Sequence, residues 1–273
     1  MELNNLSAGK TNNATSGSTF PGFRSYLSET RRIGHFLTQG DWPTVWNRSR
    51  GLAINIWNFQ VKRNQVHVEC PCCGWQGPAF LYMSTWRSIE AQSKCPRCQS
   101  RSRHRGLTLL LPDVLGDKPA GPGLVFAPEP SMMNLLERLI TESVMTTDLN
   151  KPDVHFPGED IQRLSFEDGR FAFLMCNHVL EHIPDDNQAL RECARILMPE
   201  GLAVFTIPGD FDKYDTWYFD KPDSTGHMRH YGMDVVEKMI GAGFSTVTPI
   251  DMSKDRPPRY YIRLRDMAFI CRK

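Results

Sequence analysis

The stretch "FEDGRFAFLMCNHVLEHIPDDNQALRECARILMPEGLAVFTIP", residues 166–208, decides the fold. It contains an apolar run over 171–177, a helix-patterned stretch over 186–197 and a second apolar run over 202–208. Short apolar runs bounded by turn residues are typical of strands that are buried on both faces. A strand, a helix and a second strand in succession indicate a βαβ unit, in which the two strands are parallel.

The same alternation continues on both sides of this stretch. Further strand-like runs and helix-patterned stretches cover 123–128, 131–140, 143–148 and 233–242. The last two strand-like runs, 245–251 and 260–273, have no helix between them, so we expect them to be antiparallel. The sequence therefore predicts an α/β fold with a parallel, Rossmann-like sheet and an antiparallel edge strand.

The region before the sheet divides by composition. Residues 1–20 are rich in Asn, Ser, Thr and Gly, which predicts a disordered leader. Over 21–65, aromatic and aliphatic residues recur at helical spacing, with a helix start at Asp41. Cysteine pairs and short strand-like pieces occupy 66–105, and the α/β pattern occupies 106–273.

Two Cys-x-x-Cys pairs define the chemistry of the cysteine-rich part, Cys70 with Cys73 and Cys95 with Cys98. Two such turns present four thiolates, which complete the tetrahedral shell of a zinc ion and leave no position for water. A closed shell is structural rather than catalytic, so we predict one structural Zn²⁺. Cys72 is an alternative ligand to Cys73, and a redox dithiol in one pair is the alternative to zinc.

The composition excludes several classes of partner. The chain has 32 basic and 31 acidic residues and a net charge of +1, so it has no global field that attracts nucleic acid or an anionic membrane. No apolar run approaches the roughly 20 residues of a transmembrane helix, and residues 1–20 lack a signal-peptide pattern. We expect a cytoplasmic protein without a membrane partner, whose cysteines are thiols or metal ligands.

A local basic run nevertheless follows the second cysteine pair. The segment "KCPRCQSRSRHR", residues 94–105, contains no acidic residue. It is interpreted either as a patch that binds phosphates of an RNA or a phosphorylated substrate, or as a solvated face. Its basic residues are Lys94, Arg97, Arg101, Arg103, His104 and Arg105.

Ligands of an open parallel sheet bind beyond the carboxyl ends of its strands. Here those positions hold "APEPS" (127–131), "TDLN" (147–150), "CNHVLEH" (176–182) and "IPGD" (207–210). Asp148 follows the second strand, where a carboxylate reaches a ribose diol in nucleotide-binding folds. These four loops are therefore the predicted site.

Five segments together resemble class I S-adenosylmethionine-dependent methyltransferases: "FAPEP", "TTDLN", "EDIQRLSFEDGRFAFLMCNHVLEHIPDD", "ARILMPEGLAVFTIP" and "GHMRHYG". The cysteine pairs followed by "RSRHR" resemble a bacterial branch with a zinc-ribbon-like segment before the methyltransferase domain. The resemblance covers about residues 66–270 and implies a Rossmann-like class I methyltransferase sheet preceded by a small zinc ribbon and N-terminal helices. It also implies S-adenosyl-L-methionine as the cofactor.

The resemblance implies roles for individual residues. Asp148 would bind the ribose hydroxyls, Asp160 with Ile161 would hold the adenine, and Asn177 would lie near the sulfonium. The glycine-rich first loop of the family is replaced by "APEPS", in which Glu129 would contact the amino-acid end of the cofactor. The implied cofactor-binding set is Ala127, Glu129, Asp148, Leu149, Asp160, Ile161 and Asn177.

A catalytic base is needed only if the methyl acceptor is protonated, because the cofactor already carries an activated methyl group. A histidine can remove such a proton near neutral pH. The candidates are His178, His227 and His230, while Glu181 and His182 are expected to have structural roles. The last two candidates fall in a polar insert, 209–232, whose aromatic residues predict a lid or an acceptor pocket.

We therefore predict an enzyme, a methyltransferase that acts on a small-molecule or saccharide-linked acceptor and contains a structural zinc ion. One alternative is an RNA-modifying methyltransferase, in which the ribbon and the basic run present the nucleic acid. The other is a non-catalytic binding protein that keeps the fold but has lost cofactor affinity together with its glycine loop. The near-zero net charge favours the small-molecule acceptor.

Overall fold

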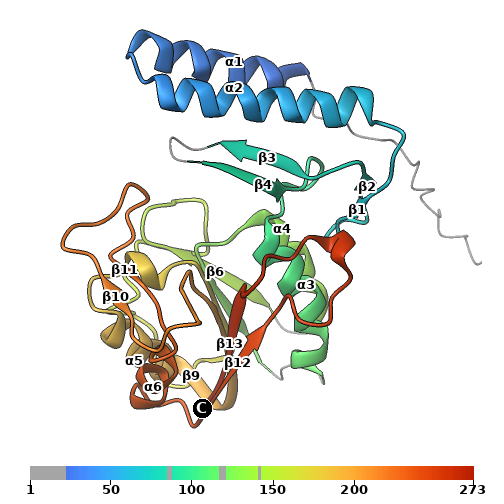
Figure 1. The fold of residues 1–273 in the computed structure, drawn as a ribbon. Helices are drawn as coiled ribbons and strands as arrows, with labels where there is room; N and C mark the ends of the chain where they lie inside the picture. The colour runs from blue at the N-terminus through green and yellow to red at the C-terminus, as the bar shows by residue number, and fades with distance from the viewer. Residues whose placement is uncertain (1–22, 85–87, 117–120, 141–142) are drawn as a thin grey trace, which may run out of the picture.

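The computed structural model describes residues 23–84, 88–116, 121–140 and 143–273, so the predicted leader, 1–20, lies outside the described residues. A helical hairpin, a pair of small two-stranded sheets and a larger α/β domain follow one another along the chain (Figure 1). The carboxyl edge of the large sheet faces the small sheets and the hairpin, and the C-terminus lies at the opposite edge (Figure 1).

Seven strands form the central sheet in the order β12-β13-β9-β8-β5-β6-β7. All neighbours are parallel except β13, which is antiparallel to both β9 and β12. This confirms the predicted α/β class and the antiparallel pair at one edge, where β12 is the outermost strand. The strands are β5 (Gly123–Phe126), β6 (Val144–Asp148), β7 (Phe156–Pro157), β8 (Phe171–Asn177), β9 (Leu197–Thr206), β12 (Thr246–Asp251) and β13 (Met267–Arg272).

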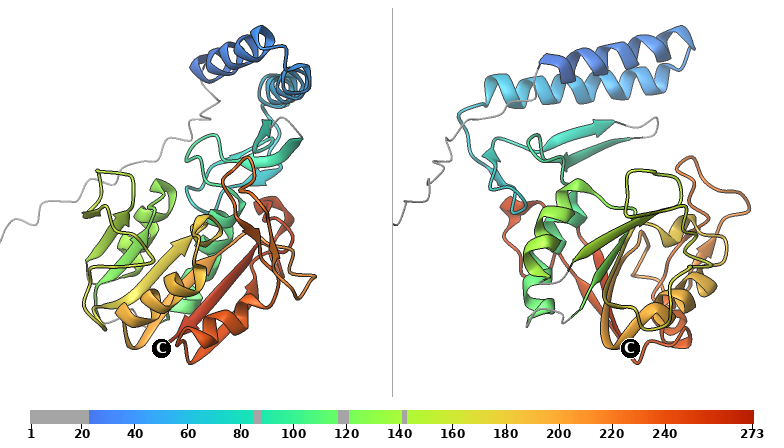
Figure 2. Two further views of the ribbon diagram at one scale, coloured as in Figure 1. Left: turned by 90° about the vertical axis from the view of Figure 1, so that its left-hand side faces the viewer. Right: turned by 180° about the vertical axis from the view of Figure 1, so that it is seen from behind.

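Helices cover both faces of this sheet (Figure 2). Helices α3 (Ser102–Leu115) and α4 (Pro130–Leu139) pack on one face, and α5 (Asp186–Ile196) and α6 (Val235–Gly241) pack on the other. Every residue of β8 is buried, because alternate side chains point to the two opposite layers. This burial on both faces explains why β8 reads as a continuous apolar run in the sequence.

The cysteine-rich part forms two small antiparallel sheets, β1 (Val68–Glu69) with β2 (Gln76–Gly77) and β3 (Leu81–Ser84) with β4 (Ile89–Lys94). The cysteines pack there with a small set of buried apolar side chains, Phe59, Val68, Trp75 and Phe80. So few apolar residues form only a minimal core, which is typical of a small module stabilised by a metal.

The N-terminal hairpin consists of α1 (Phe23–Thr38) and α2 (Trp42–Ile56), and α2 continues into a π-helical turn, η1 (Trp57–Val61). Asp41 is the N-cap of α2 and accepts a hydrogen bond of 3.2 Å from the amide of Thr44, as its position in the sequence predicts. Asn55 fixes the hairpin to β3 with two hydrogen bonds to the backbone of Tyr82, at 2.9 and 3.0 Å.

The predicted polar insert contains a short antiparallel pair, β10 (Trp217–Tyr218) with β11 (Arg229–His230). The one-turn helix η2 (Leu180–His182) follows β8 and lies beneath this insert, because the amide of Met228 donates a hydrogen bond of 2.8 Å to the carbonyl of Glu181. A second such turn, η3 (Pro258–Tyr260), lies between β12 and β13. We call residues 209–232 the lid.

Candidate functional site

The carboxyl ends of four adjacent strands bring the predicted cofactor residues to one edge of the sheet. Phe126 at the end of β5 is paired with Thr147 of β6 and with Cys176 of β8, and Asn177 is paired with Thr206 of β9. Because these strands end level with one another, the side chains that follow them face the same space.

Glu129 is the centre of a hydrogen-bond network at this edge. It is the residue before α4, and its Oε1 accepts a hydrogen bond of 2.6 Å from Arg103. Its Oε2 accepts from Nε2 of His104 at 2.7 Å and also from the side-chain amide of Asn177. The hydroxyl of Thr206 donates in turn to the amide oxygen of Asn177. Groups from α3, β8 and β9 therefore hold one carboxylate in place.

The hydrogen bonds of His104 fix its tautomer. The backbone N–H of Arg101 points at Nδ1 from 3.1 Å, and an N–H can only donate, so Nδ1 carries the lone pair and Nε2 carries the proton that Glu129 accepts. Burial lowers the pKa of His104, which keeps the ring neutral. Burial alone would raise the pKa of Glu129, but the hydrogen bond from His104 and the charge of Arg103 lower it to about 2.

Asp148 ends β6 with its carboxylate fixed by the following turn. Its Oδ1 accepts hydrogen bonds of 2.9 Å from the amides of Asn150 and Lys151, and the ammonium of Lys151 lies 3.3 Å from Oδ2. Burial raises the pKa of Asp148, but these hydrogen bonds outweigh it and the net pKa is lowered. An ionised carboxylate suits the hydroxyl donors of a ribose, and beside it Leu149 is half exposed.

Asp160 and Ile161 lie in the loop between β7 and β8. The amide of Gln162 donates a hydrogen bond of 2.9 Å to Oδ1 of Asp160, which fixes the turn, and Ile161 is buried. The expected adenine contact of these two residues stays a prediction.

Two residues at the strand ends have left-handed backbone conformations. Ala127 directly follows β5 with φ of 47°, and His178 directly follows β8 with φ of 54°. Such conformations are uncommon outside glycine and cluster at functional sites. The loop that lacks the expected glycines thus still contains one residue in a conformation that glycine adopts easily.

Glu181 joins two of the three predicted bases. Its carboxylate is fully buried, His178 Nδ1 lies 3.1 Å from Oε1, and His227 Nε2 lies 4.0 Å from the same oxygen. The rings of His182 and His227 are in edge contact, with centroids 4.8 Å apart. His182 forms a hydrogen bond of 3.1 Å with the carbonyl of Gly226, in keeping with the expected structural role, whereas no described group forms a hydrogen bond with either carboxylate oxygen of Glu181.

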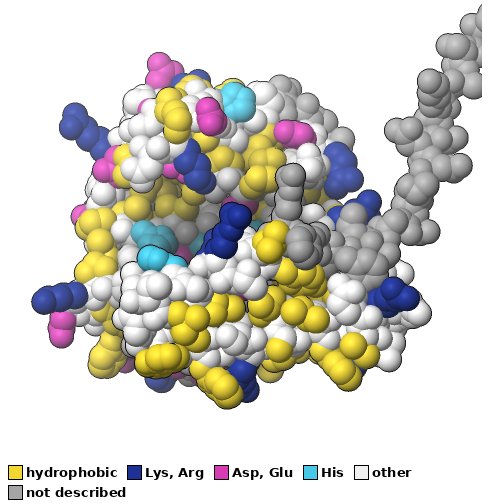
Figure 3. Space-filling view, turned by 90° about the horizontal axis from the view of Figure 1, so that it is seen from above, with side chains coloured by type: hydrophobic (Ala, Val, Ile, Leu, Met, Phe, Trp, Pro, Cys, Tyr) yellow, Lys and Arg dark blue, Asp and Glu magenta, His cyan; other side chains and the backbone are white. Residues whose placement is uncertain are grey.

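The third predicted base, His230, lies apart on β11, opposite Trp217. Both residues line a cavity of about 730 Å³ that is formed within the lid, and His227 lines the same cavity. The lining also includes Tyr214, Phe219 and Tyr231, so most of its large side chains are aromatic. The face seen from above is hollowed near its middle, where histidine and Lys or Arg side chains gather (Figure 3).

The four predicted zinc ligands lie together. The Sγ atoms of Cys70, Cys73, Cys95 and Cys98 are all within 4.8 Å of one another. Each pair forms the same turn, with a left-handed residue directly after the second cysteine, Gly74 in one turn and Gln99 in the other. This donor set fits a tetrahedral zinc ion, which would be held by four thiolates at about 2.3 Å.

Cys72 lies beside this cluster but is not one of the four closely grouped thiols. Its Sγ lies 3.1 Å from the hydroxyl of Thr108 on α3, whereas Sγ of Cys73 lies 3.8 Å from that of Cys95. The geometry therefore favours Cys73 over Cys72 as the fourth ligand.

The basic run is not an open patch. Arg103 is bound to Glu129, and Arg105 is completely buried, so the phosphate-binding interpretation fails for these two side chains. The guanidinium of Arg105 donates to the backbone carbonyls of Tyr260 and Tyr261, both at 2.8 Å, and lies 4.0 Å above the ring of Phe80. The first turn of α3 thus connects the ribbon to the α/β domain.

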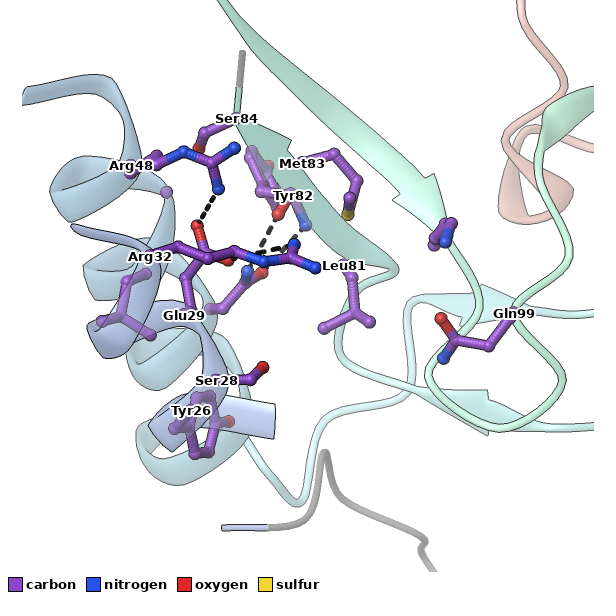
Figure 4. Close-up of a pocket in the computed structure, with 14 residues that line it drawn as sticks. Tyr26, Ser28, Glu29, Arg32, Arg48, Leu81, Tyr82, Met83, Ser84 and Gln99 are labelled. Atoms are coloured by element: carbon purple, nitrogen blue, oxygen red, sulfur yellow. Dashed lines mark hydrogen bonds and ion pairs between the residues drawn. The ribbon is translucent and has the colours of Figure 1, made fainter. Parts of the chain in front are cut away.

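A second cavity, of about 290 Å³, lies between the hairpin and β3 (Figure 4). Glu29 of α1 and Arg48 of α2, which both line it, form an ion pair of 2.7 Å, and Arg32 lies beside them (Figure 4). Glu29 is the one carboxylate among the described lining residues, beside the basic side chains of Arg32, Arg48 and Lys94.

The comparisons with known proteins concern the α/β domain. Residues 128–205, from the loop before α4 to the end of β9, match the family described as "Methyltransferase domain". This match supports an S-adenosylmethionine-dependent methyltransferase. It includes Glu129, Asp148, Asp160 and Asn177.

Two curated relatives match parts of the chain. An uncharacterised 37.1 kDa protein of transposon TN4556 from Streptomyces fradiae is 34% identical over 113 residues, covering 37% of this chain and 32% of that protein. A ubiquinone biosynthesis O-methyltransferase of Coxiella burnetii is 28% identical over 83 residues, covering 30% of this chain and 36% of that protein. The chain thus spans about a third of the length of these relatives.

Among solved structures, the 1,6-didemethyltoxoflavin-N1-methyltransferase of Burkholderia thailandensis, with S-adenosylhomocysteine bound, is 20% identical with a TM-score of 0.46. The comparison covers 63% of this chain and 78% of that one. A methyltransferase described as S-adenosylmethionine-dependent from Listeria monocytogenes gives 15% identity and a TM-score of 0.45, over 63% of this chain and 98% of that one.

No helix in the described part of the chain has both the length and the apolar composition that a membrane span requires.

Proposed function

We propose that the protein transfers a methyl group from S-adenosylmethionine to a small-molecule or saccharide-linked acceptor. The observation that carries this proposal is the set of fixed polar groups at the carboxyl ends of β5, β6 and β8, within the segment that matches a methyltransferase domain. The bound cofactor would supply an activated methyl group, so the protein's main task is to hold and orient.

Each of these residues would contact a different part of the cofactor. Asp148 would accept hydrogen bonds from the ribose hydroxyls, and Asp160 with Ile161 would border the adenine. Glu129 already accepts from three donors and remains ionised, so it would accept one more hydrogen bond from the ammonium of the cofactor. Asn177 would lie beside the sulfonium.

The zinc site would be structural. Cys70, Cys73, Cys95 and Cys98 would close the shell of the ion, and the small core around them gives the ribbon few other sources of stability.

The acceptor would bind within the lid, in the cavity that His227 and His230 line. An aromatic lining suits a small organic acceptor better than a nucleic-acid backbone. Arg103 and Arg105, which an RNA would need at the surface, are bound within the protein, so the RNA-modifying alternative has less support.

The test is calorimetric titration of S-adenosylmethionine and S-adenosylhomocysteine into folded protein of known zinc content. We expect micromolar binding that Asp148→Ala weakens roughly tenfold or more, because hydrogen bonds to a charged acceptor are lost. Asp153→Ala, an exposed carboxylate in the same loop, is the matched control and should bind like the wild type. Absence of binding to the zinc-replete wild type would refute the proposal and leave a non-catalytic binding protein.

A further inference from the structure

Outside the expected cofactor contacts, three ligand-type side chains meet beneath the lid. One ligand atom each of Glu181, His182 and His227 lies within 4.8 Å of the others. Glu181 and His182 belong to η2 directly after β8, whereas His227 comes from the lid. Segments far apart in the sequence thus converge on one point.

The buried carboxylate of Glu181 has neither a hydrogen-bond donor nor a permanent cation beside it among the described residues. It is fully buried, and neither oxygen accepts a hydrogen bond from any described group. An ionised carboxylate in such a place is destabilised by several kcal/mol unless a cation balances it. The nearest nitrogen is Nδ1 of His178 at 3.1 Å, which is a cation only when that ring is protonated.

The two histidines of the group are oriented as metal ligands usually are. Nδ1 of His182 lies 3.1 Å from the carbonyl of Gly226, and a carbonyl can only accept, so Nδ1 carries the proton and Nε2 carries the lone pair. His227 turns Nε2 toward Glu181, while its Nδ1 faces the carboxylate of Asp223 at 3.9 Å. A hydrogen-bonded carbonyl behind the imidazole is a common support of metal-binding histidines, and His182 has one, whereas Asp223 is near His227 but beyond hydrogen-bond distance.

The lid loop that supplies these supports is itself fixed. Oδ1 of Asp223 accepts hydrogen bonds from the amides of Thr225 and His227, at 2.7 and 3.0 Å. The amide of Met228 is bound to the carbonyl of Glu181 at 2.8 Å. The group is therefore held together by the backbone rather than by chance side-chain positions.

We propose that Glu181, His182 and His227 bind a divalent first-row transition-metal ion, such as Mn²⁺, Fe²⁺ or Zn²⁺. Two imidazoles and one carboxylate form a donor set that suits these ions and leaves coordination positions open. The ion would neutralise the buried carboxylate. His178 lies beside it as a fourth nearby donor.

The open positions would face the acceptor, because His227 also lines the lid cavity. This part rests on the proposed methyltransferase function. An acceptor hydroxyl bound to the ion would lose its proton to water more readily. The oxygen lone pair then forms the bond to the methyl carbon as the carbon–sulfur bond breaks, and S-adenosylhomocysteine leaves as a neutral thioether. The expected acceptor is therefore a hydroxyl compound.

The test is titration of full-length, zinc-replete protein with Mn²⁺, with the free ion measured by electron paramagnetic resonance. Mn²⁺ prefers oxygen and nitrogen donors to a thiolate site, so the cysteine cluster does not interfere. We expect one Mn²⁺ per chain, and Glu181→Gln and His227→Asn should each weaken its binding about tenfold or more. His230→Ala, a histidine of the same cavity outside the group, should bind Mn²⁺ like the wild type.

If Glu181→Gln fails to fold by circular dichroism, His227→Asn alone carries the comparison. Absence of Mn²⁺ and Co²⁺ binding beyond the cysteine site, or binding that neither variant changes, would overturn the proposal. Titration of S-adenosylmethionine into the same samples separates the two proposals, because metal binding without cofactor binding would refute only the proposed transfer reaction.

Discussion

Nε2 of His104 lies 2.7 Å from Oε2 of Glu129, which joins the first turn of α3 to the loop after β5. The same carboxylate is bound by Arg103 and Asn177. Glu129 is therefore held in the loop after β5 by groups from α3 and β8.

The pKa of Glu129 makes its contribution to stability depend on pH. The pKa is lowered from 4.5 to about 2, so the stabilisation is present above pH 4.5 and is lost as the pH falls toward 2. At pH 7, Glu129→Gln should lower the free energy of unfolding by about 2–3 kcal/mol. Urea unfolding at pH 7, 5 and 4 measures this, and the difference from wild type should shrink at the lowest pH.

Glu137→Gln on the exposed side of the same helix is the control, and it should change stability little at any of these pH values. A difference between wild type and Glu129→Gln that stays constant from pH 7 to 4 would contradict the assignment.

Zinc content should distinguish the two adjacent cysteines. Cys73→Ser should lose the ion, because one of four thiolates is removed, whereas Cys72→Ser should keep it, because Cys72 contacts Thr108 instead. Elemental analysis of the purified variants gives the zinc per chain. Equal zinc loss in both variants would show that the two thiols share the ligand position.

Arg105 should be the most sensitive basic residue of its run. Replacing it by Lys removes most of its hydrogen bonds to carbonyls of η3 and the ribbon and leaves those carbonyls buried, so the free energy of unfolding should fall by at least about 3 kcal/mol. Chemical denaturation measures the loss. Arg63→Lys, at an exposed position, is the control, and its free energy of unfolding should lie within about 0.5 kcal/mol of the wild-type value. An equally small change for Arg105→Lys would show that the hydrogen bonds of Arg105 do not stabilise the fold.

Asn55 should control the docking of the hairpin. Asn55→Ala leaves the backbone amide and carbonyl of Tyr82 without their partners and should increase the rate of proteolytic cleavage within residues 23–61. Ser49→Ala, on the exposed face of the same helix, is the comparison. Identical cleavage rates in the two variants would mean that other contacts hold the hairpin.

Much of the sheet could be predicted because its central strands β5 and β8 are buried on both faces. Phe171–Asn177 has no polar residue before its last position, and the run therefore stands out without any knowledge of its neighbours. The place of Asp148 at the end of β6 and the grouping of the four cysteines could also be predicted, because the first depends on the end of one strand and the second on the Cys-x-x-Cys spacing.

Long-range contacts explain what the sequence did not reveal. Arg105 lies in a polar run, where arginine is normally exposed, and its partners Tyr260 and Tyr261 come from far along the chain. Glu181 likewise stands in a short polar segment, and its complete burial results from the lid that covers η2.

Helix α3 starts at Ser102, soon after Cys98, and its first turn supplies Arg103 and His104 to Glu129. A polypeptide that began at Gly106 would keep every strand of the sheet and still lack both donors. The carboxylate beside the expected cofactor would then have only Asn177 as its partner. The first turn of α3 thus links the cysteine-rich part to the carboxylate beside the expected cofactor site, so removing a metal ion bound by the four cysteines should weaken cofactor binding, although none of those cysteines lies in the α/β domain.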